Sequence, residues 1–271
     1  METLEKEILR GGQFLVKESK CEDVFTPEDF SEEQIMMKDA VKEFNDREII
    51  AHRERFEAKD YKLTEEVMKK AGELGFLGVA VPEEYGGLGM GFVSTMITCE
   101  YISSGNGSLS TAFGAHTGIG TMPITLYGTE EQKQKYVPKL ASGEWMGAYC
   151  LTEPGAGSDA NSGKTVATLS EDGMSYKING QKMWISNAHT GDRGLLYAIT
   201  DREAGHKGMT CFIINPKETE GIMTSAIETK LGLHCAPTGE IAFDGAKIPK
   251  DAVLGEVGQG FQICMWQLNN T

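Results

Sequence analysis

The sequence predicts an α+β protein, in which an all-α domain is followed by an antiparallel β-sandwich or barrel. Up to Gly143, apolar residues recur at helical spacing between capping signals. After Gly143, short strand-like runs alternate with Gly and Asp turns. A length of 271 residues suits roughly two domains of about 150 residues. We therefore expect a helical domain at 1–144, a β domain at 145–255 and a further helical segment at 256–271.

The helical half begins with a capping box. Ser31 can accept a hydrogen bond from an orphan backbone N–H, and Gln34, three residues later, can reach back. Apolar residues at helical spacing follow this pair. A second helix is expected to open at Thr64 and to end before Gly75, since glycine is favoured just beyond a helix.

Further helices are expected at 92–102 and within the apolar segment 109–127. Thr129 and Gln132 form another capping box. Pro138 lies inside the helix that follows, and its ring is expected to kink or end that helix.

Strand signals dominate the second half. The expected strands are 146–151, 165–169, 174–178, 182–186, 195–200, 210–215, 222–227 and 240–243. From residue 258 to the end, the pattern is apolar and helical again.

Charge and cysteine usage exclude several classes of function. The net charge of −14 disfavours binding to nucleic acid or to anionic membranes. No run of about 18 apolar residues is present, so no transmembrane segment is expected. The 6 cysteines are widely spaced without a CxxC pair, which predicts no metal site and no disulfide framework. The N-terminus resembles neither a secretory signal nor a transit peptide, so we expect a cytoplasmic protein.

The segment 155–160 matches the loose G-x-G-x-x-A pattern of dinucleotide-binding folds, but that pattern requires a helix directly after it. Asn161, Ser162 and Gly163 follow instead, and then a strand-like run, so we do not expect a nicotinamide site.

Two segments contain residues suited to a flat heterocycle. Segment 149–159 runs from a strand into a glycine-rich loop, and segment 182–187 carries one tryptophan among small polar residues. Glycine allows close approach of backbone donors, and tryptophan can cover one face of an aromatic ring. These are requirements for holding an isoalloxazine ring, although a β-turn with a core tryptophan satisfies the same pattern.

The chain resembles the acyl-CoA dehydrogenase family over essentially its whole length. Four segments in the same order carry the resemblance, namely VPEEYGGLG at 81–89, YCLTEPGAGSD at 149–159, INGQKMWISN at 178–187 and VLGEVGQGF at 253–261. The family implies a helical domain, a β middle domain and a C-terminal four-helix domain. By this resemblance, residues 256–271 would be no more than the first helix of that bundle, which would be truncated here. It also implies α,β-dehydrogenation of a fatty acyl-CoA to the trans-2-enoyl-CoA in β-oxidation, with FAD as cofactor and an electron-transfer flavoprotein as acceptor.

The resemblance assigns site residues by position. Those implied to line the flavin are Tyr149, Cys150, Leu151, Thr152, Gly157, Ser158, Trp184, Ile185 and Ser186. Ser158 and Asn269 are implied to contact the acyl-CoA. No catalytic residue is assigned within the chain, because the base glutamate is expected beyond Thr271. We therefore expect little dehydrogenase activity and weak FAD binding from this chain alone, and a homodimer or homotetramer for a complete enzyme.

Several functional interpretations remain open. A related acyl-CoA oxidase or flavin monooxygenase would share the fold, and so would a non-catalytic module that binds acyl-CoA or FAD. Gly114 and Ala115 resemble the very-long-chain branch, and small residues there would admit a long acyl tail or, equally, close helix packing. His116 is interpreted as a polar helix residue, and Glu153 as structural rather than as the base.

Overall fold

The computed structural model describes residue 9 and residues 11–270, so the expected ends at residues 1 and 271 lie outside the described part. The helices of the first half are α1 (Glu32–Phe44), α2 (Arg53–Glu57), α3 (Tyr61–Glu73), α4 (Phe92–Gly105), α5 (Gly107–Gly114), α6 (Met122–Tyr127) and α7 (Glu130–Ala141). A π-helical segment, Ala115–Thr121, joins α5 to α6. A second π-helical segment, Asn45–Ile49, follows α1.

Both predicted capping boxes are confirmed. The Ser31 hydroxyl accepts from the Gln34 N–H at 3.2 Å, and the Gln34 side chain accepts from the Ser31 N–H at 3.0 Å. Thr129 and Gln132 form the same pair at the start of α7. Gly75 follows α3 with φ +82°, as the helix end requires.

The predicted start of α3 was wrong, and the helix predicted to kink or end at Pro138 does not end there. Helix α3 begins at Tyr61 rather than Thr64, because the Asp60 side chain caps it by accepting the Leu63 N–H at 3.2 Å. Helix α7 runs through Pro138 to Ala141. Val137 and Leu140 are fully buried on either side of the proline, and their packing holds the last turn in place.

The second half forms a sheet followed by helix α8 (Gly260–Asn270). Its strands are β1 (Gly147–Cys150), β2 (Val166–Leu169), β3 (Ser175–Ile185), β4 (Arg193–Ile199), β5 (Met209–Ile214), β6 (Ile222–Ala226), β7 (Gly239–Pro249) and β8 (Val253–Leu254). The strand order is β6-β7-β3-β2-β4-β5-β8, with β1 on β4. Most pairs are antiparallel, but β1 and β2 each run parallel to β4, so the sheet is mixed.

Two of the predicted strands, 174–178 and 182–186, form the single strand β3. The pairing of β3 with β7 shifts register between Ile178 and Asn179, because Gly245 of β7, whose φ is +65°, has no paired residue on β3. β7 therefore carries the bulge, and β3 continues through the gap between the two predicted strands.

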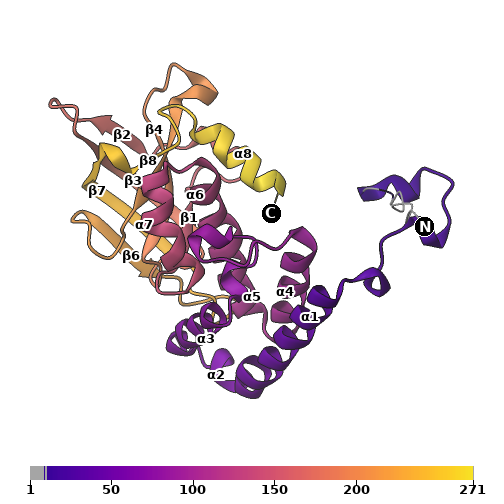
Figure 1. Cartoon of the computed structure of the whole chain (residues 1–271). Coiled ribbons are helices and arrows are strands. Elements are labelled where there is room, and N and C mark those ends of the chain that lie inside the picture. Colours follow the sequence, from indigo (N-terminus) through magenta and orange to yellow (C-terminus); the bar gives the residue numbers. More distant parts are fainter. Residues whose placement is uncertain (1–8, 10, 271) are drawn as a thin grey trace.

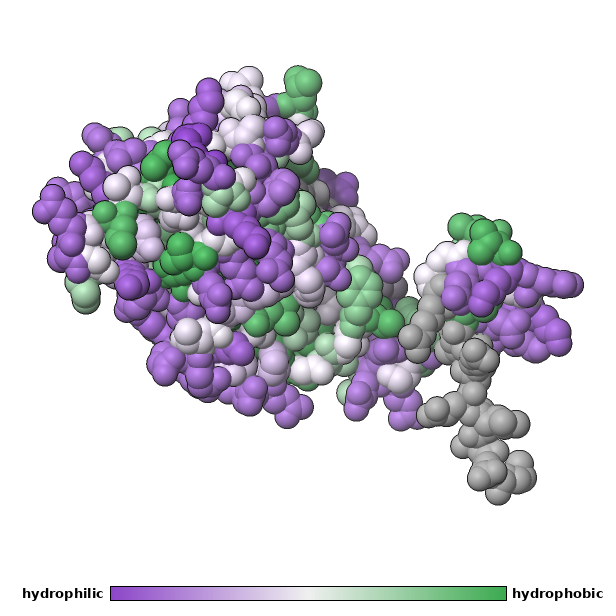
Figure 2. Space-filling model, turned by 90° about the horizontal axis from the view of Figure 1, so that it is seen from above, coloured by the Kyte–Doolittle hydropathy of each residue, from purple (hydrophilic) through white to green (hydrophobic). Residues whose placement is uncertain are grey.

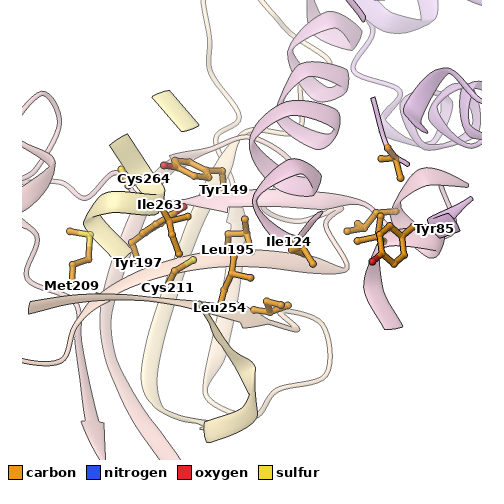
Figure 3. Packing of buried hydrophobic residues seen from close by; sticks show 14 of the residues in the cluster. Tyr85, Ile124, Tyr149, Leu195, Tyr197, Met209, Cys211, Leu254, Ile263 and Cys264 are labelled. Carbon is orange, nitrogen blue, oxygen red and sulfur yellow. The ribbon is translucent and has the colours of Figure 1, made fainter. Parts of the chain in front are cut away.

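The sheet curves around its own core. Side chains from β3 and β7 pack in one buried cluster with side chains from β4 and β5, as expected for a sandwich or barrel. Another buried cluster joins the sheet to the helices, and Figure 3 shows Ile124 of α6 near Leu195 of β4, and Cys264 of α8 beside Tyr149 of β1. A third cluster forms the core of the helical half.

Figure 1 shows α1 to α5 grouped at one end of the molecule, the sheet at the other and α8 alongside the sheet. Residues 11–30, before α1, extend away from the body. Figure 2 shows a largely hydrophilic face on which the hydrophobic side chains form separate small patches. No helix among the described residues is long and apolar enough to cross a membrane.

Candidate flavin and acyl site

The glycine-rich loop that follows β1 lies beside the end of β3. The Met183 N–H donates a hydrogen bond to the Thr152 carbonyl at 2.9 Å. Within the loop, Glu153 and Ala156 exchange both of their backbone hydrogen bonds at 3.1 Å, which closes a tight turn. The structure thus brings the two predicted segments, 149–159 and 182–187, together. A single 3₁₀ turn and then β2 follow the loop, so the helix that a dinucleotide motif needs is missing here.

A buried ion pair fixes this arrangement. The Lys182 ammonium lies 2.7 Å from Glu153 Oε1, and the two side chains are 2% and 6% exposed. The Glu153 carboxylate also accepts the N–H groups of Lys164, at 2.6 Å, and Thr165, at 3.1 Å. Although burial alone would raise the pKa of Glu153, the Lys182 ammonium and these donors hold it below its usual value. Glu153 is therefore fully engaged as a structural anion, in agreement with its predicted role.

Trp184 is held in an unusual backbone conformation and projects from the protein. Its φ is +60°, in the left-handed region that costs a residue with a side chain about 1–2 kcal/mol. Its side chain is 58% exposed. Strain of this kind persists where the surrounding structure imposes it, and it gathers at functional sites. The exposed indole can stack on a planar ligand.

The remaining predicted flavin residues fall into two groups. The surface group consists of the half-buried Leu151, Thr152 and Ser186 and the exposed Gly157 and Ser158. The buried group consists of Tyr149, Cys150 and Ile185. Because these three side chains pack into the hydrophobic clusters, only their backbone atoms can face a ligand. Figure 3 shows Tyr149 lying close to Cys264, inside the protein.

A cavity of about 870 Å³ lies between the helical half and α8. Its walls come from the turn before α4, from α4, from the α5 to α6 segment and from α8. Most of the lining side chains are apolar, whereas α8 contributes the polar Gln267, Asn269 and Asn270. No Asp or Glu is among the described residues that line it. The cavity suits an apolar chain with a polar group at one end.

The two residues predicted to contact substrate lie in different places. Asn269 lines the cavity, whereas Ser158 is exposed on the glycine-rich loop and is not part of the cavity wall. Gly114 also lines the cavity, and a Cβ at this position would meet no heavy atom within 4 Å. Ala115 is buried in the protein instead.

The described residues contain no group of three or more His, Cys, Asp or Glu that could hold a metal ion. The cysteines are free thiols.

His116 was interpreted from the sequence as a polar helix residue. It lies in the π-helical segment and is fully buried, and both of its ring nitrogens are hydrogen-bonded to backbone groups. Sequence periodicity gave no signal for this burial, because the contacts come from α7 and β1.

Comparison with known families identifies the chain. The model for "Acyl-CoA dehydrogenase, N-terminal domain" matches residues 31–144, and that for "Acyl-CoA dehydrogenase, middle domain" matches residues 148–246. The chain belongs to the acyl-CoA dehydrogenase family.

Relatives within the acyl-CoA dehydrogenase family are similar over most of this chain. A probable acyl-CoA dehydrogenase of Bacillus subtilis is 41% identical over 263 residues, which is 97% of this chain and 43% of the relative. The glutaryl-CoA dehydrogenase of Desulfococcus multivorans is 40% identical over 243 residues, 89% of this chain and 62% of the relative. The chain thus spans about half the length of such relatives.

Solved structures agree with this membership. An acyl-CoA dehydrogenase from Bacillus anthracis, complexed with FAD, superposes with a TM-score of 0.88 at 42% identity, covering 96% of this chain and 44% of that one. The prolyl acyl carrier protein oxidase AnaB superposes with a TM-score of 0.82 at 30% identity, covering 88% of this chain and 63% of that one.

Proposed function

We propose that this chain supplies the flavin-binding surface and part of the acyl-binding cavity of an FAD-dependent acyl-CoA dehydrogenase. The observation that carries the proposal is the joining of the glycine-rich loop to the Trp184 strand by the buried Glu153–Lys182 pair. Exposed Trp184 would cover one face of the isoalloxazine ring, and the Thr152 hydroxyl and backbone would face its edge. Bound FAD supplies the hydride acceptor for conversion of a fatty acyl-CoA to the trans-2-enoyl-CoA.

The substrate is proposed to lie in the cavity that α8 closes. Its apolar walls would bind the acyl tail, and Asn269 would contact the more polar arm of the thioester. We also propose a long acyl chain, supported by the open space at Gly114. Relatives at similar identity include isovaleryl-CoA and very long-chain specific acyl-CoA dehydrogenases, so this preference rests on the cavity rather than on identity.

The 271 residues by themselves are proposed to be inactive in dehydrogenation. Removal of the α-proton needs a base beside the substrate, and no carboxylate of the described residues lines the cavity. Glu153 cannot serve as this base, because Lys182 and two backbone N–H groups already bind it.

The same proposal includes an electron-transfer flavoprotein as electron acceptor, assembly into a homodimer or homotetramer, and a role in β-oxidation. A cytoplasmic location is supported by the free thiols.

Flavin titration tests the central claim. The purified chain is expected to bind FAD weakly, with a change in the flavin absorbance spectrum, and Trp184→Ala is expected to weaken this binding at least tenfold further while thermal unfolding stays similar. A matched control is Trp266→Ala, which alters an exposed tryptophan on the cavity wall instead. Absence of FAD binding by the wild-type chain, or equal affinity in both tryptophan variants, would contradict the proposal.

An oxidase is the second candidate, favoured by the similarity to AnaB. The chain, combined with FAD and an acyl-CoA, can be assayed for hydrogen peroxide and for dye reduction. Peroxide production would favour the oxidase. Enoyl-CoA formed with either acceptor by protein of verified mass 29.5 kDa would contradict the proposed inactivity.

A further inference from the structure

The Lys182 ammonium contacts a peptide group of the flavin loop as well as Glu153. Its Nζ donates to the Leu151 carbonyl at 3.0 Å, besides its 2.7 Å contact with Glu153 Oε1. The lysine comes from β3, and the carbonyl follows β1, 31 residues earlier. The side chain of Lys182 is 2% exposed, so bulk water does not screen this contact.

Of the two charged groups in the buried pair, the Lys182 ammonium is the one that contacts the Leu151 carbonyl. The Glu153 carboxylate accepts hydrogen bonds from the N–H groups of Lys164 and Thr165, just before β2. The ammonium therefore contributes the nearest charge to the carbonyl. Hydrogen bonds from ionised donors are about twice as strong as neutral ones, and they polarise the acceptor group in a medium of low dielectric.

Polarisation of a carbonyl reaches the other end of the same peptide group. The N–H that shares this group with the Leu151 carbonyl belongs to Thr152, whose backbone is proposed above to face the flavin edge. A more positive N–H at that edge interacts more favourably with a ligand that gains negative charge than with the neutral ligand. Such a donor distinguishes reduced from oxidised flavin.

We propose that Lys182 is a positioning residue that raises the reduction potential of the flavin through the Leu151–Thr152 peptide group, with Glu153 holding its ammonium in place. This inference rests on the proposed function, because it requires FAD at this surface. A pair that only tethers the loop would affect both flavin states equally. Preferential stabilisation of the reduced state is therefore the property to test.

The test removes both charges but keeps a hydrogen bond between residue 153 and the backbone just before β2. In the double variant Lys182→Met with Glu153→Gln, the glutamine oxygen can still accept an N–H of Lys164 or Thr165. Affinities for oxidised and reduced FAD are measured together with the midpoint potential, by equilibration with redox dyes. We expect oxidised FAD to bind within about threefold of wild type and reduced FAD to bind about tenfold more weakly, which corresponds to a decrease of about 30 mV for a two-electron couple.

Two further variants complete the comparison. Lys182→Arg keeps the charge and is expected to keep most of the wild-type potential. Lys177→Met removes an exposed lysine of the same strand and is expected to change neither affinity. If the double variant does not fold, Lys182→Gln, which keeps a neutral donor for the Leu151 carbonyl, is expected to give the same loss for reduced FAD.

An unchanged potential in a folded variant that lacks the charge would overturn the inference, and so would equal losses for both flavin states. Failure of the wild-type chain to bind FAD is a separate result. It would contradict the proposed function itself, and the inference would fall with it.

Discussion

His116 accepts a hydrogen bond from the Gly147 N–H at 2.9 Å through Nδ1, while its Nε2 lies 3.0 Å from the Leu140 carbonyl oxygen. One side chain thus connects the π-helical segment, the end of α7 and the first strand. Since Nδ1 accepts and Nε2 can only donate to a carbonyl, the ring is neutral with its proton on Nε2. Burial lowers the pKa of His116 to about 4.

This lowered pKa predicts loss of stability in mild acid. Between pH 6.5, the ordinary His116 pKa, and about pH 4, the unfolded chain binds a proton that the folded chain does not. The His116 contribution is thus complete above pH 6.5 and is lost progressively as the pH falls toward 4, by at most about 1.4 kcal/mol per pH unit. Urea unfolding from pH 7.5 to 4.5 measures it.

The control for this pH dependence is His116→Asn. Its Oδ1 can accept the Gly147 N–H, but the side chain does not titrate. The variant is expected to be less stable at pH 7, because it loses the contact with Leu140, and to show a shallower decrease between pH 6.5 and 4. A decrease as steep as that of the wild type would show that other groups cause it.

Replacing Trp184 with glycine is expected to separate stability from ligand binding. Glycine adopts the observed φ of +60° without the steric cost, so Trp184→Gly should raise the free energy of unfolding by up to about 1 kcal/mol. The same change removes the indole and should abolish measurable FAD binding. Asn187→Gly is the matched control, because Asn187 has φ +62° but donates to the carbonyls of Ala112 and Gly147. Asn187→Gly should therefore lower the free energy of unfolding.

Gln132 has a second role that Gln34, its equivalent in the capping box of α1, does not share. Its Nε2 donates to the carbonyls of Asp251 and Val253 at 2.8 and 2.9 Å, and so attaches α7 to the chain just before α8. Gln132→Glu keeps the cap but places a carboxylate against two carbonyls, at a cost of about 2–3 kcal/mol. At the half-buried Gln34, the change Gln34→Glu should be neutral or slightly stabilising, because it places an anion at a helix N-terminus. Equal changes in the free energy of unfolding for Gln132→Glu and Gln34→Glu, measured by chemical denaturation, would refute this distinction.

The cavity predicts how acyl length affects binding. Gly114→Phe projects into open space, so the protein should fold with little change in thermal stability. The ring would occupy part of the cavity, which should weaken binding of a long-chain acyl-CoA about tenfold or more and leave a four-carbon acyl-CoA nearly unaffected. Calorimetric titration of wild type and variant with both ligands measures the loss of affinity for each acyl length. An equal loss for the two lengths would place the acyl tail elsewhere.

Local sequence signals predicted much of the fold, and the exceptions have physical causes. Capping boxes depend on residues three apart, so both were predicted correctly. The start of α3 and the continuation of α7 through Pro138 were not, because Asp60 offered an alternative cap and tertiary packing outweighed the proline. The parallel pairing of β1 with β4 joins residues 46 positions apart, and no local pattern indicates it.

The sequence predicted which residues belong to the candidate site, but not how they contact one another. The sequence indicated the flavin loop and the Trp184 strand, yet the Glu153–Lys182 contact spans 29 residues and depends on how the strands pair. The burial of Tyr149, Cys150 and Ile185 likewise depends on which face of each strand meets a core. Trp184 adopts a left-handed conformation that is rare for tryptophan, and propensity gives no indication of it.

The parallel pairing of β1 with β4 also has a consequence for the order in which the chain folds. Residues 147–150 align with 193–196, so the flavin loop and the Trp184 strand both lie within the loop that this pairing closes. Closing such a loop costs entropy before its contacts form, and parallel pairing is accordingly slow. The binding surface should thus mature late in folding, and a ligand that contacts both segments should slow unfolding by holding that loop closed.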